Sequence, residues 1–282
     1  MQKDEIMQQL IGQGLAQTSD DIVRLLLPSI RIKPRPADEQ SLAVGQSKMG
    51  GLPDLPAQTP WPLWKNVPLS FVAQIRLRDV TAHDVQNLLP HTGLLSFFYD
   101  PAQQVYGDNP AERDGWKVIY TKDDKVPLTR FAAPAALPAN ARFTASALDF
   151  STEQTLPQRP SDHLKTLAWT EQESKSYEAF LAKYPSEADH KVSRHRMLGY
   201  PDELQDDMRI EAQFASHGVN SHDARAAALA AGAANWQLLL QVDTDERAGI
   251  HWPDAGTIYY WIEEQALRAQ NFNNVWLVLQ TT

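Results

Sequence analysis

Four short blocks of this sequence occur twice and in the same order, and an internal repeat constrains the fold more strongly than any single motif does. The matched pairs are KMGGLPDLP (48–56) with RMLGYPDEL (196–204), LSFVAQI (69–75) with WQLLLQV (236–242), GLLSFFYD (93–100) with GTIYYWIE (256–263), and WKVIYT (116–121) with WLVLQT (276–281). The spacing between the copies changes from block to block, as a duplication followed by loop insertions would produce. Chance similarity among short apolar strands is the alternative.

Three of the four blocks fall on predicted strands. Runs of apolar, β-branched and aromatic residues bounded by Gly, Pro or Asp are typical of strands, and they occur at 68–77, 93–100, 115–121, 141–150, 236–243, 256–262 and 274–281. The run at 29–36 alternates like an exposed or edge strand, because its prolines cannot donate to a sheet. Between 47 and 62, Gly and Pro are so frequent that we expect neither a helix nor a strand.

Helical periodicity separates these strands. Thr170 and Glu173 form a capping box, and the apolar residues that follow recur at helical spacing. We expect helices within 1–28, a short helical crossover at 77–90, a helix within 161–184, one after Asp202, one capped by Ser221, and one around 263–269.

The order of these elements predicts an α+β fold. We expect it to be internally duplicated, with two similar, mostly antiparallel β units that carry flanking helices and are related by a pseudo-two-fold axis. The expected division is an N-terminal helical segment (1–30), a first α+β repeat (31–150), a helical connector (151–190) and a second α+β repeat (191–282), packed as one compact domain.

Composition excludes several classes of function. The chain has 282 residues, no cysteine and a formal net charge of −9. Without cysteine there are no disulfides, thiolate nucleophiles or thiolate zinc sites. The acidic balance and the scattered basic residues argue against nucleic-acid binding. No segment reads as a signal peptide or a membrane span, so we expect a cytoplasmic protein with no membrane partner.

The glycines of the repeated corner predict backbone geometry. Gly51 and Gly199 occupy matched positions two residues before a proline, so we expect a positive φ or a close backbone approach at both. A phosphate-binding loop is the competing interpretation, but neither copy has the glycine spacing of a P-loop or a dinucleotide fingerprint.

The blocks together resemble the YwqG-like family of bacterial proteins, a family of unknown function. The resemblance rests on SKMGGLPDLP, PLSFVAQI and GLLSFFYD in the first half, and on HRMLGYPDELQ, WQLLLQVDTD and HWPDAGTIYYWI in the second. It implies a duplicated α+β fold and no particular reaction. Pro253 stands where the family commonly has glycine, which implies a different loop geometry here.

The stretch from Asp243 to Asp254 is the strongest candidate for a metal site. Asp243, Asp245 and Asp254 lie at positions 1, 3 and 12 of a twelve-residue stretch, as in a calcium loop, and His251 adds a potential ligand. However, Ala248 occupies position 6, where an EF-hand needs glycine. A solvated acidic turn between two strands is the alternative.

Gln74 and Gln241 are the strongest candidates for ligand contacts, because each places a polar group at the same point of an apolar strand. Trp61 and Trp252 are further candidates, at strand ends where aromatic residues line a pocket or cover a core. The alternative for the two glutamines is a structural hydrogen bond to the loop of the other copy.

No catalytic signature accompanies these residues. We therefore expect a non-enzymatic protein-interaction module, immunity-like or regulatory, that binds another protein. The alternative is a small-ligand-binding or metal-binding enzyme with its site at the interface between the repeats. No cofactor is predicted except, in that alternative, a divalent metal, and the oligomeric state is not predicted.

Overall fold

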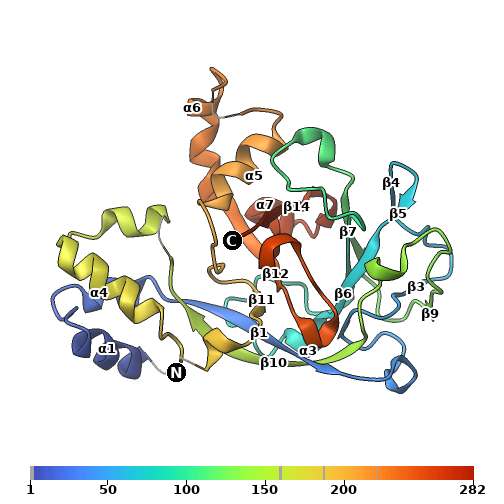
Figure 1. Ribbon diagram of the computed structural model, residues 1–282, viewed down its shortest axis with the longest axis horizontal. Coiled ribbons are helices and arrows are strands. Elements are labelled where there is room, and N and C mark those ends of the chain that lie inside the picture. Colours follow the sequence, from blue (N-terminus) through green and yellow to red (C-terminus); the bar gives the residue numbers. More distant parts are fainter. Residues whose placement is uncertain (1–2, 159–160, 187, 221) are drawn as a thin grey trace.

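One antiparallel sheet of ten strands forms the centre of the computed structural model, which describes residues 3–158, 161–186, 188–220 and 222–282 (Figure 1). The strands lie in the order β14-β13-β12-β11-β1-β10-β2-β6-β7-β8. Their bounds are β1 (Leu27–Pro36), β2 (Lys48–Met49), β6 (Ser70–Arg76), β7 (Leu94–Tyr99), β8 (Trp116–Thr121), β10 (Ser146–Thr155), β11 (His195–Met197), β12 (Trp236–Asp243), β13 (Thr257–Glu263) and β14 (Trp276–Gln280).

Two small sheets and seven α-helices accompany the large sheet in the described residues. The small sheets are β3 (Asp54–Pro56) with β9 (Leu128–Arg130), and β4 (Leu63–Trp64) with β5 (Val67–Pro68). The helices are α1 (Lys3–Gly12), α2 (Ser19–Arg24), α3 (Leu77–Val80), α4 (Glu171–Leu181), α5 (Met208–Ser216), α6 (Ala226–Leu229) and α7 (Glu264–Arg268). The predicted α+β class with mostly antiparallel strands is confirmed.

The strand order is the same when counted outward from the central pair β1–β10. On one side β10 contacts β2, followed by β6, β7 and β8; on the other β1 contacts β11, followed by β12, β13 and β14. The ladder β6–β7 shifts register between Phe71 and Ala73, and β12–β13 shifts between Leu238 and Leu240. Both shifts fall at matched positions of the repeated blocks, so the two halves of the sheet share strand order and irregularity.

Strand β1 lies in the middle of the sheet, and the prediction of an edge strand at 29–36 was wrong. β1 pairs with β10 over its whole length but with β11 only from Ile30 to Ile32. Pro34 and Pro36 therefore lie where the β11 side is already unpaired, and a missing N–H costs no ladder bond there. The prolines end the pairing with β11 without excluding the strand from the sheet.

Other boundaries also differ from the sequence expectations. The stretch 47–62, expected to contain no strand, contains β2 and β3, which are too short to show alternation. The strand expected at 141–150 is β10, displaced toward the C-terminus, and the crossover expected at 77–90 contains only the four-residue helix α3. Ser221, expected to cap a helix, lies outside the described residues.

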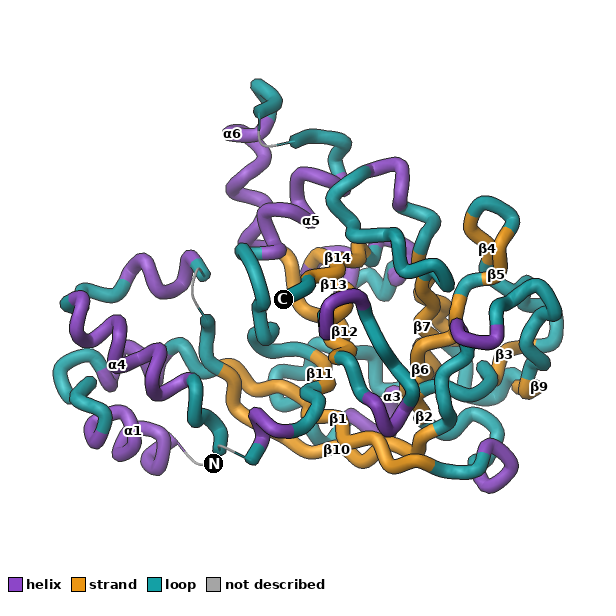
Figure 2. Tube along the Cα trace, viewed as in Figure 1, coloured by secondary structure: helices purple, strands orange, loops and turns teal. Residues whose placement is uncertain are grey.

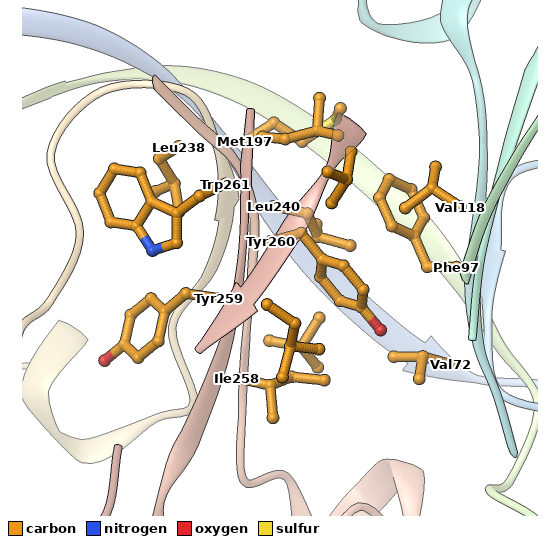
Figure 3. Packing of buried hydrophobic residues seen from close by; sticks show 14 of the residues in the cluster. Val72, Phe97, Val118, Met197, Leu238, Leu240, Ile258, Tyr259, Tyr260 and Trp261 are labelled. Atoms are coloured by element: carbon orange, nitrogen blue, oxygen red, sulfur yellow. The ribbon is translucent and has the colours of Figure 1, made fainter. Parts of the chain in front are cut away.

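The sheet curls into a nearly closed barrel whose two edge strands approach each other. The indole Nε1–H of Trp116 on β8 donates to the Val275 carbonyl at 2.9 Å, and that of Trp276 on β14 donates to the Gly107 carbonyl at 2.8 Å. Inside, Tyr260 points from β13 toward Phe97, with ring centroids 5.1 Å apart (Figure 3). The two halves therefore share one apolar core.

A helical unit with its own apolar core lies at one end of the β1–β10 pair (Figure 2). Helices α1, α2 and α4 contribute buried Ile6, Leu10, Ile22, Tyr177 and Phe180. The capping box of α4 is confirmed, because Thr170 Oγ1 accepts from the Glu173 N–H and the Glu173 carboxylate accepts from the Thr170 N–H. In the part of the chain described, no helix is long and apolar enough to cross a membrane.

Candidate functional site

The repeated corner has the same backbone geometry in both halves. Gly51 has φ +72° and Gly199 has φ +69°, which confirms the predicted positive φ. A Cβ at Gly199 would lie 2.6 Å from Ser29 Cβ and from Thr155 Oγ1. Glycine is thus suited to these positions for two reasons: it adopts the left-handed backbone conformation, and it leaves room for nearby residues of the same chain.

The two glutamines make matched hydrogen bonds behind these corners. Gln74 Oε1 accepts from the Asp54 N–H at 2.8 Å, and its Nε2 donates to Asp54 Oδ2 at 2.8 Å. Gln241 Oε1 accepts from the Asp202 N–H at 2.9 Å, and its Nε2 donates to Asp202 Oδ2 at 2.8 Å. The remaining Nε2–H groups donate to the carbonyls of Gln46 and Arg194. Each amide is bonded within its own half rather than to the other copy.

The four predicted ligand residues do not converge on one place. Gln74 and Gln241 are buried behind separate corners. Trp61 lines an open groove over the first half. Trp252 is buried, donates to the Val242 carbonyl, and packs against Tyr99. Ligand binding by these residues together stays a prediction.

The residues of the predicted metal loop are also dispersed. Asp245 is buried against His195 and also contacts Arg247, whereas the Asp243 carboxylate accepts from the Arg194 N–H and the Thr257 hydroxyl. His251 and Asp254 are exposed. Among the described residues, no group of three His, Asp or Glu side chains is arranged to hold a metal. Metal binding here stays a prediction without geometric support.

A hollow of about 110 Å³, with a mostly apolar lining and a few polar groups, lies instead over the second half of the sheet. Strands β12 and β13 form its floor with the outer face of the sheet. Tyr260 projects from β13 into the barrel, and Trp261 projects from the opposite side toward the hollow (Figure 3). Loops on either side form the walls. The lining residues are Leu27, Pro157, Gln158, Ser161, His163, Gly199, Tyr200, Pro201, Glu203, Arg209, Ala234, Trp236, Gln237, Leu238 and Trp261.

The matched region of the first half is filled with apolar side chains. Leu55 is fully buried and packs with Phe98, whose ring lies 5.8 Å from that of Trp61. The repeated blocks place Glu203 at the position of Leu55, and Trp261 at the position of Phe98. Leu55 and Phe98 therefore fill this space in the first half, whereas Glu203 and Trp261 line a hollow in the second half.

Burial controls the charge of Glu203. It raises the pKa of this carboxyl to about 8, with Asp207 as the next contributor. The acid is therefore mostly protonated near neutral pH, and its O–H is available as a donor. A carboxyl of raised pKa in a hollow is the kind of group that marks functional sites.

Arg209 organises the opposite wall. Its Nε donates to Asp207 Oδ1 at 3.0 Å, and its Nη1 contacts His163 Nε2 at 2.9 Å. Because a guanidinium only donates, His163 Nε2 must accept and the imidazole is neutral. Burial lowers the pKa of His163, and Arg209 lowers it further. The His163 ring packs edge-on against Tyr200, with centroids 5.3 Å apart.

The indole N–H of Trp261 is the least satisfied polar group of the lining. Trp261 is 2% exposed, and no described residue accepts from its Nε1–H. Trp236, beside it, donates to Gln213 Oε1 at 2.8 Å. An unpartnered buried N–H costs roughly 1–3 kcal/mol, so this indole N–H is a donor without an acceptor among the described residues.

Sequence reasoning did not identify this hollow. Its walls come from segments far apart in the chain, and the repeated blocks predict only features that the two halves share. The usable signal was a difference between them. An acid at Glu203 follows the shared Pro-Asp pair, whereas Leu55 follows it in the other copy.

Fold and site together define an α+β protein with one large antiparallel sheet and a hollow over one half of it. The chain belongs to the family of the domain of unknown function DUF1963, whose family model matches residues 47–281. A comparison with curated proteins gives no match. The YwqG-like name stays a prediction, and membership of this family assigns neither a reaction nor a ligand.

Proposed function

We propose that the chain binds a small organic molecule in the hollow lined by Glu203 and Trp261. The observation that carries this proposal is the contrast between the halves: the first half fills the matched space with Leu55 and Phe98, whereas the second leaves about 110 Å³ beside an unpartnered indole N–H. Ligand sites are concave and mostly apolar, with a few convergent polar groups, and the hollow has this character.

The lining favours an uncharged molecule with an oxygen acceptor. Trp261 and the protonated Glu203 offer donors, and the charge of Arg209 is already balanced by Asp207. The aromatic walls of Tyr200 and Trp236 favour a small flat body. Because one water occupies about 30 Å³ in the liquid, the hollow has room for roughly four waters or for an organic molecule of similar volume.

Isotope-edited NMR of the whole protein tests this proposal. The indole N–H resonance of Trp261 is assigned by its loss in Trp261→Phe, a substitution that reproduces Phe98 of the other half. The probes are isopropanol, acetamide, acetic acid and isopropylamine, which have similar size and differ in polar group. We expect isopropanol and acetamide to shift the Trp261 resonance saturably, and isopropylamine to leave it unchanged.

Glu203→Leu is the matched control, because it places the residue of the first half in the hollow. We expect this variant to fold and to lose the probe-dependent shift. The proposal fails if no probe shifts the resonance in the native protein, or if the same shift persists in Glu203→Leu.

A second candidate function is binding of another protein, the role expected from the sequence. An open groove of about 380 Å³ runs beside Trp61, Leu63 and Trp116. Leu63 is 55% exposed, on the hairpin β4–β5 that projects from the molecule. Contiguous exposed apolar surface often marks an interaction site. We expect native protein to form a stoichiometric cross-link to its partner protein, and Leu63→Asp to abolish it. Val85→Asp, at an exposed apolar residue elsewhere, should preserve the cross-link. Its loss in both variants would contradict this role for the groove.

We also infer that the two halves descend from one duplicated unit. The shared strand order, the register shifts at matched positions, and the parallel hydrogen bonds of Gln74 and Gln241 support this inference. Superposing 48–121 on 196–281 should align at least three strands in order. A superposition that pairs strands in a different order would contradict it.

A further inference from the structure

Two cavities adjoin at the edge strand β8. The open groove beside Trp61 and Leu63, of about 380 Å³, shares Asp114, Trp116 and Lys117 with a second cavity of about 250 Å³. We call this second cavity the seam cleft, because it lies between β8 and the segment that precedes β14. Its other lining residues are Arg113, Val118, Phe272, Asn273, Asn274 and Val275. An apolar groove and a mostly polar cleft are therefore continuous at β8.

The open groove presents apolar surface to a partner. The indole N–H of Trp61 already donates to the Leu69 carbonyl at 3.0 Å, so the ring offers its apolar faces. Leu63 and Ile119 add aliphatic side chains to the lining. Lys117 is the only cationic residue among the described residues that line this groove. An apolar side chain bound here would be removed from water, and that burial is favourable.

Asn273 holds two cations together in the seam cleft. Lys117 Nζ donates to Asn273 Oδ1 at 2.8 Å, and Arg113 Nη2 donates to the Asn273 carbonyl at 3.4 Å. The Arg113 guanidinium also lies over the ring of Trp276, 5.7 Å from its centroid. An ammonium group has three N–H donors and a guanidinium has five. Both cations therefore keep further donors beyond their bonds to Asn273.

The charges at this place favour an anionic partner. Within the described part of the chain, neither Arg113 nor Lys117 forms an ion pair. Asp114 is the only acid among the described residues that line the groove and the cleft. Two cations therefore accompany one acid, in a chain whose formal net charge is −9. A locally positive lining attracts a carboxylate and repels an amine.

We propose that an acidic segment of a partner protein docks here, with an apolar side chain in the open groove and the carboxylate of a neighbouring residue at Arg113 and Lys117. This inference rests on the second candidate function, protein binding at the groove, and names the chemistry of the partner. The carboxylate accepts charge-assisted hydrogen bonds from both cations. Because Lys117 lines both cavities, the acid of the partner must be adjacent to its apolar residue.

Titration of the whole protein with short peptides at low salt tests the proposal. The reporter is the indole N–H resonance of Trp61, assigned by its loss in Trp61→Phe. The probes are acetyl-leucyl-aspartyl amide, its asparaginyl and seryl-aspartyl counterparts, and N-acetyl-leucine. We expect the leucyl-aspartyl peptide to shift the resonance saturably, the asparaginyl peptide to bind about two- to five-fold more weakly, as for an exposed ion pair, and the seryl peptide not to bind. Tighter binding of N-acetyl-leucine would overturn the proposal in favour of a chain terminus.

Variants assign the effect to the named charges. Lys117→Gln and Arg113→Gln should each weaken binding of the leucyl-aspartyl peptide about two- to five-fold. Asp114→Asn should tighten it, because the substitution removes the acid that repels the carboxylate, and damage to the fold cannot produce a gain in affinity. Lys33→Gln, at an exposed lysine of β1, is the control and should change nothing. No saturable shift, equal binding of the aspartyl and asparaginyl peptides, or an unchanged affinity in Asp114→Asn would overturn the proposal.

The cross-link to the partner protein distinguishes this inference from the function on which it rests. We expect Arg113→Gln to reduce the cross-link yield at low salt, where charge interactions are screened least. If Leu63→Asp abolishes the cross-link and Arg113→Gln leaves its yield unchanged, protein binding at the groove stands and the acidic partner is overturned. If Leu63→Asp also preserves the cross-link, both fail.

Discussion

Trp116 and Trp276 join the two edges of the sheet. Their rings pack edge-on with centroids 4.9 Å apart, and each donates its indole N–H to a carbonyl of the opposite half. They occupy matched positions of the repeated blocks. Matched tryptophans therefore join the two edges through different partners, Val275 next to β14 and Gly107 in the loop before β8.

Trp116→Phe should destabilise the protein by about 1–3 kcal/mol, because it removes a buried hydrogen bond and leaves the Val275 carbonyl unpaired. Urea denaturation measures this change. Trp64→Phe, at a partly buried tryptophan whose indole N–H bonds to no described residue, is the control; it removes only packing and should cost less than Trp116→Phe. Equal effects of the two substitutions would mean that the indole N–H of Trp116 does not stabilise the closure.

Gln74→Glu and Gln241→Glu should both destabilise the fold near neutral pH, and to a similar degree. Each places a second carboxylate against a buried aspartate, Asp54 or Asp202, so one of the pair must take up a proton. The deficit relative to native protein should therefore shrink as the pH falls below about 5. Tm measured from pH 4 to pH 8 checks this. A deficit that does not vary with pH would point to lost packing instead.

Gly199→Ala should cost more than about 1 kcal/mol, because φ at this position is +69° and the new Cβ would meet Ser29 and Thr155. Gly12→Ala is the matched control, since it ends helix α1 and a Cβ there meets nothing within 4 Å. That substitution should be neutral or stabilising. Chemical denaturation distinguishes the two, and equal costs would show that the corner tolerates a side chain.

The pH dependence of stability should report Glu203 together with Glu211, whose pKa burial raises to about 7; the contribution of Glu203 extends to the higher pH. The pKa of its carboxyl is about 8 in the folded protein against an ordinary value of 4.5. The folded state therefore binds more protons than the unfolded state between these values, and stability falls as pH rises through this window. The contribution is fully present below about pH 4.5 and is lost above pH 8.

Glu203→Gln removes this titration. The variant should gain stability relative to native protein between pH 5 and pH 9, as measured by Tm in matched buffers. Glu246→Gln, on an exposed turn, should run parallel to native protein. If Tm falls with rising pH as steeply in Glu203→Gln as in native protein and in Glu246→Gln, the pH dependence belongs to other groups.

Sequence reasoning could predict the long strands and the corners, because their signals are local. Alternating apolar residues mark β7 and β13, and glycine marks the positive φ at Gly51 and Gly199. The place of β1 in the sheet could not be read locally. Its prolines predict an edge, and only the short extent of β11 explains why they are accommodated. β11 itself has three residues, too few for any periodicity.

The candidate site was out of reach for a different reason. Gln74 and Gln241 are buried polar groups, as the sequence predicts, yet the corners use their hydrogen-bonding capacity. The hollow exists because loops from distant parts of the chain lie a certain distance apart, and no local sequence pattern predicts that distance. The sequence signal for the hollow is a difference between the repeated blocks, Leu55 in one and Glu203 in the other.

The pairing of β1 with β10 also governs how the chain must be made. Leu27 accepts a hydrogen bond from Thr155, 128 residues later. At a synthesis rate of about 5–20 residues per second, roughly 6–25 s pass between the synthesis of β1 and that of the end of β10. The interval is longer for helices α1 and α2, because their apolar core also needs residues of α4. The nascent chain therefore exposes its first apolar surfaces for several seconds before the segments that cover them are synthesised.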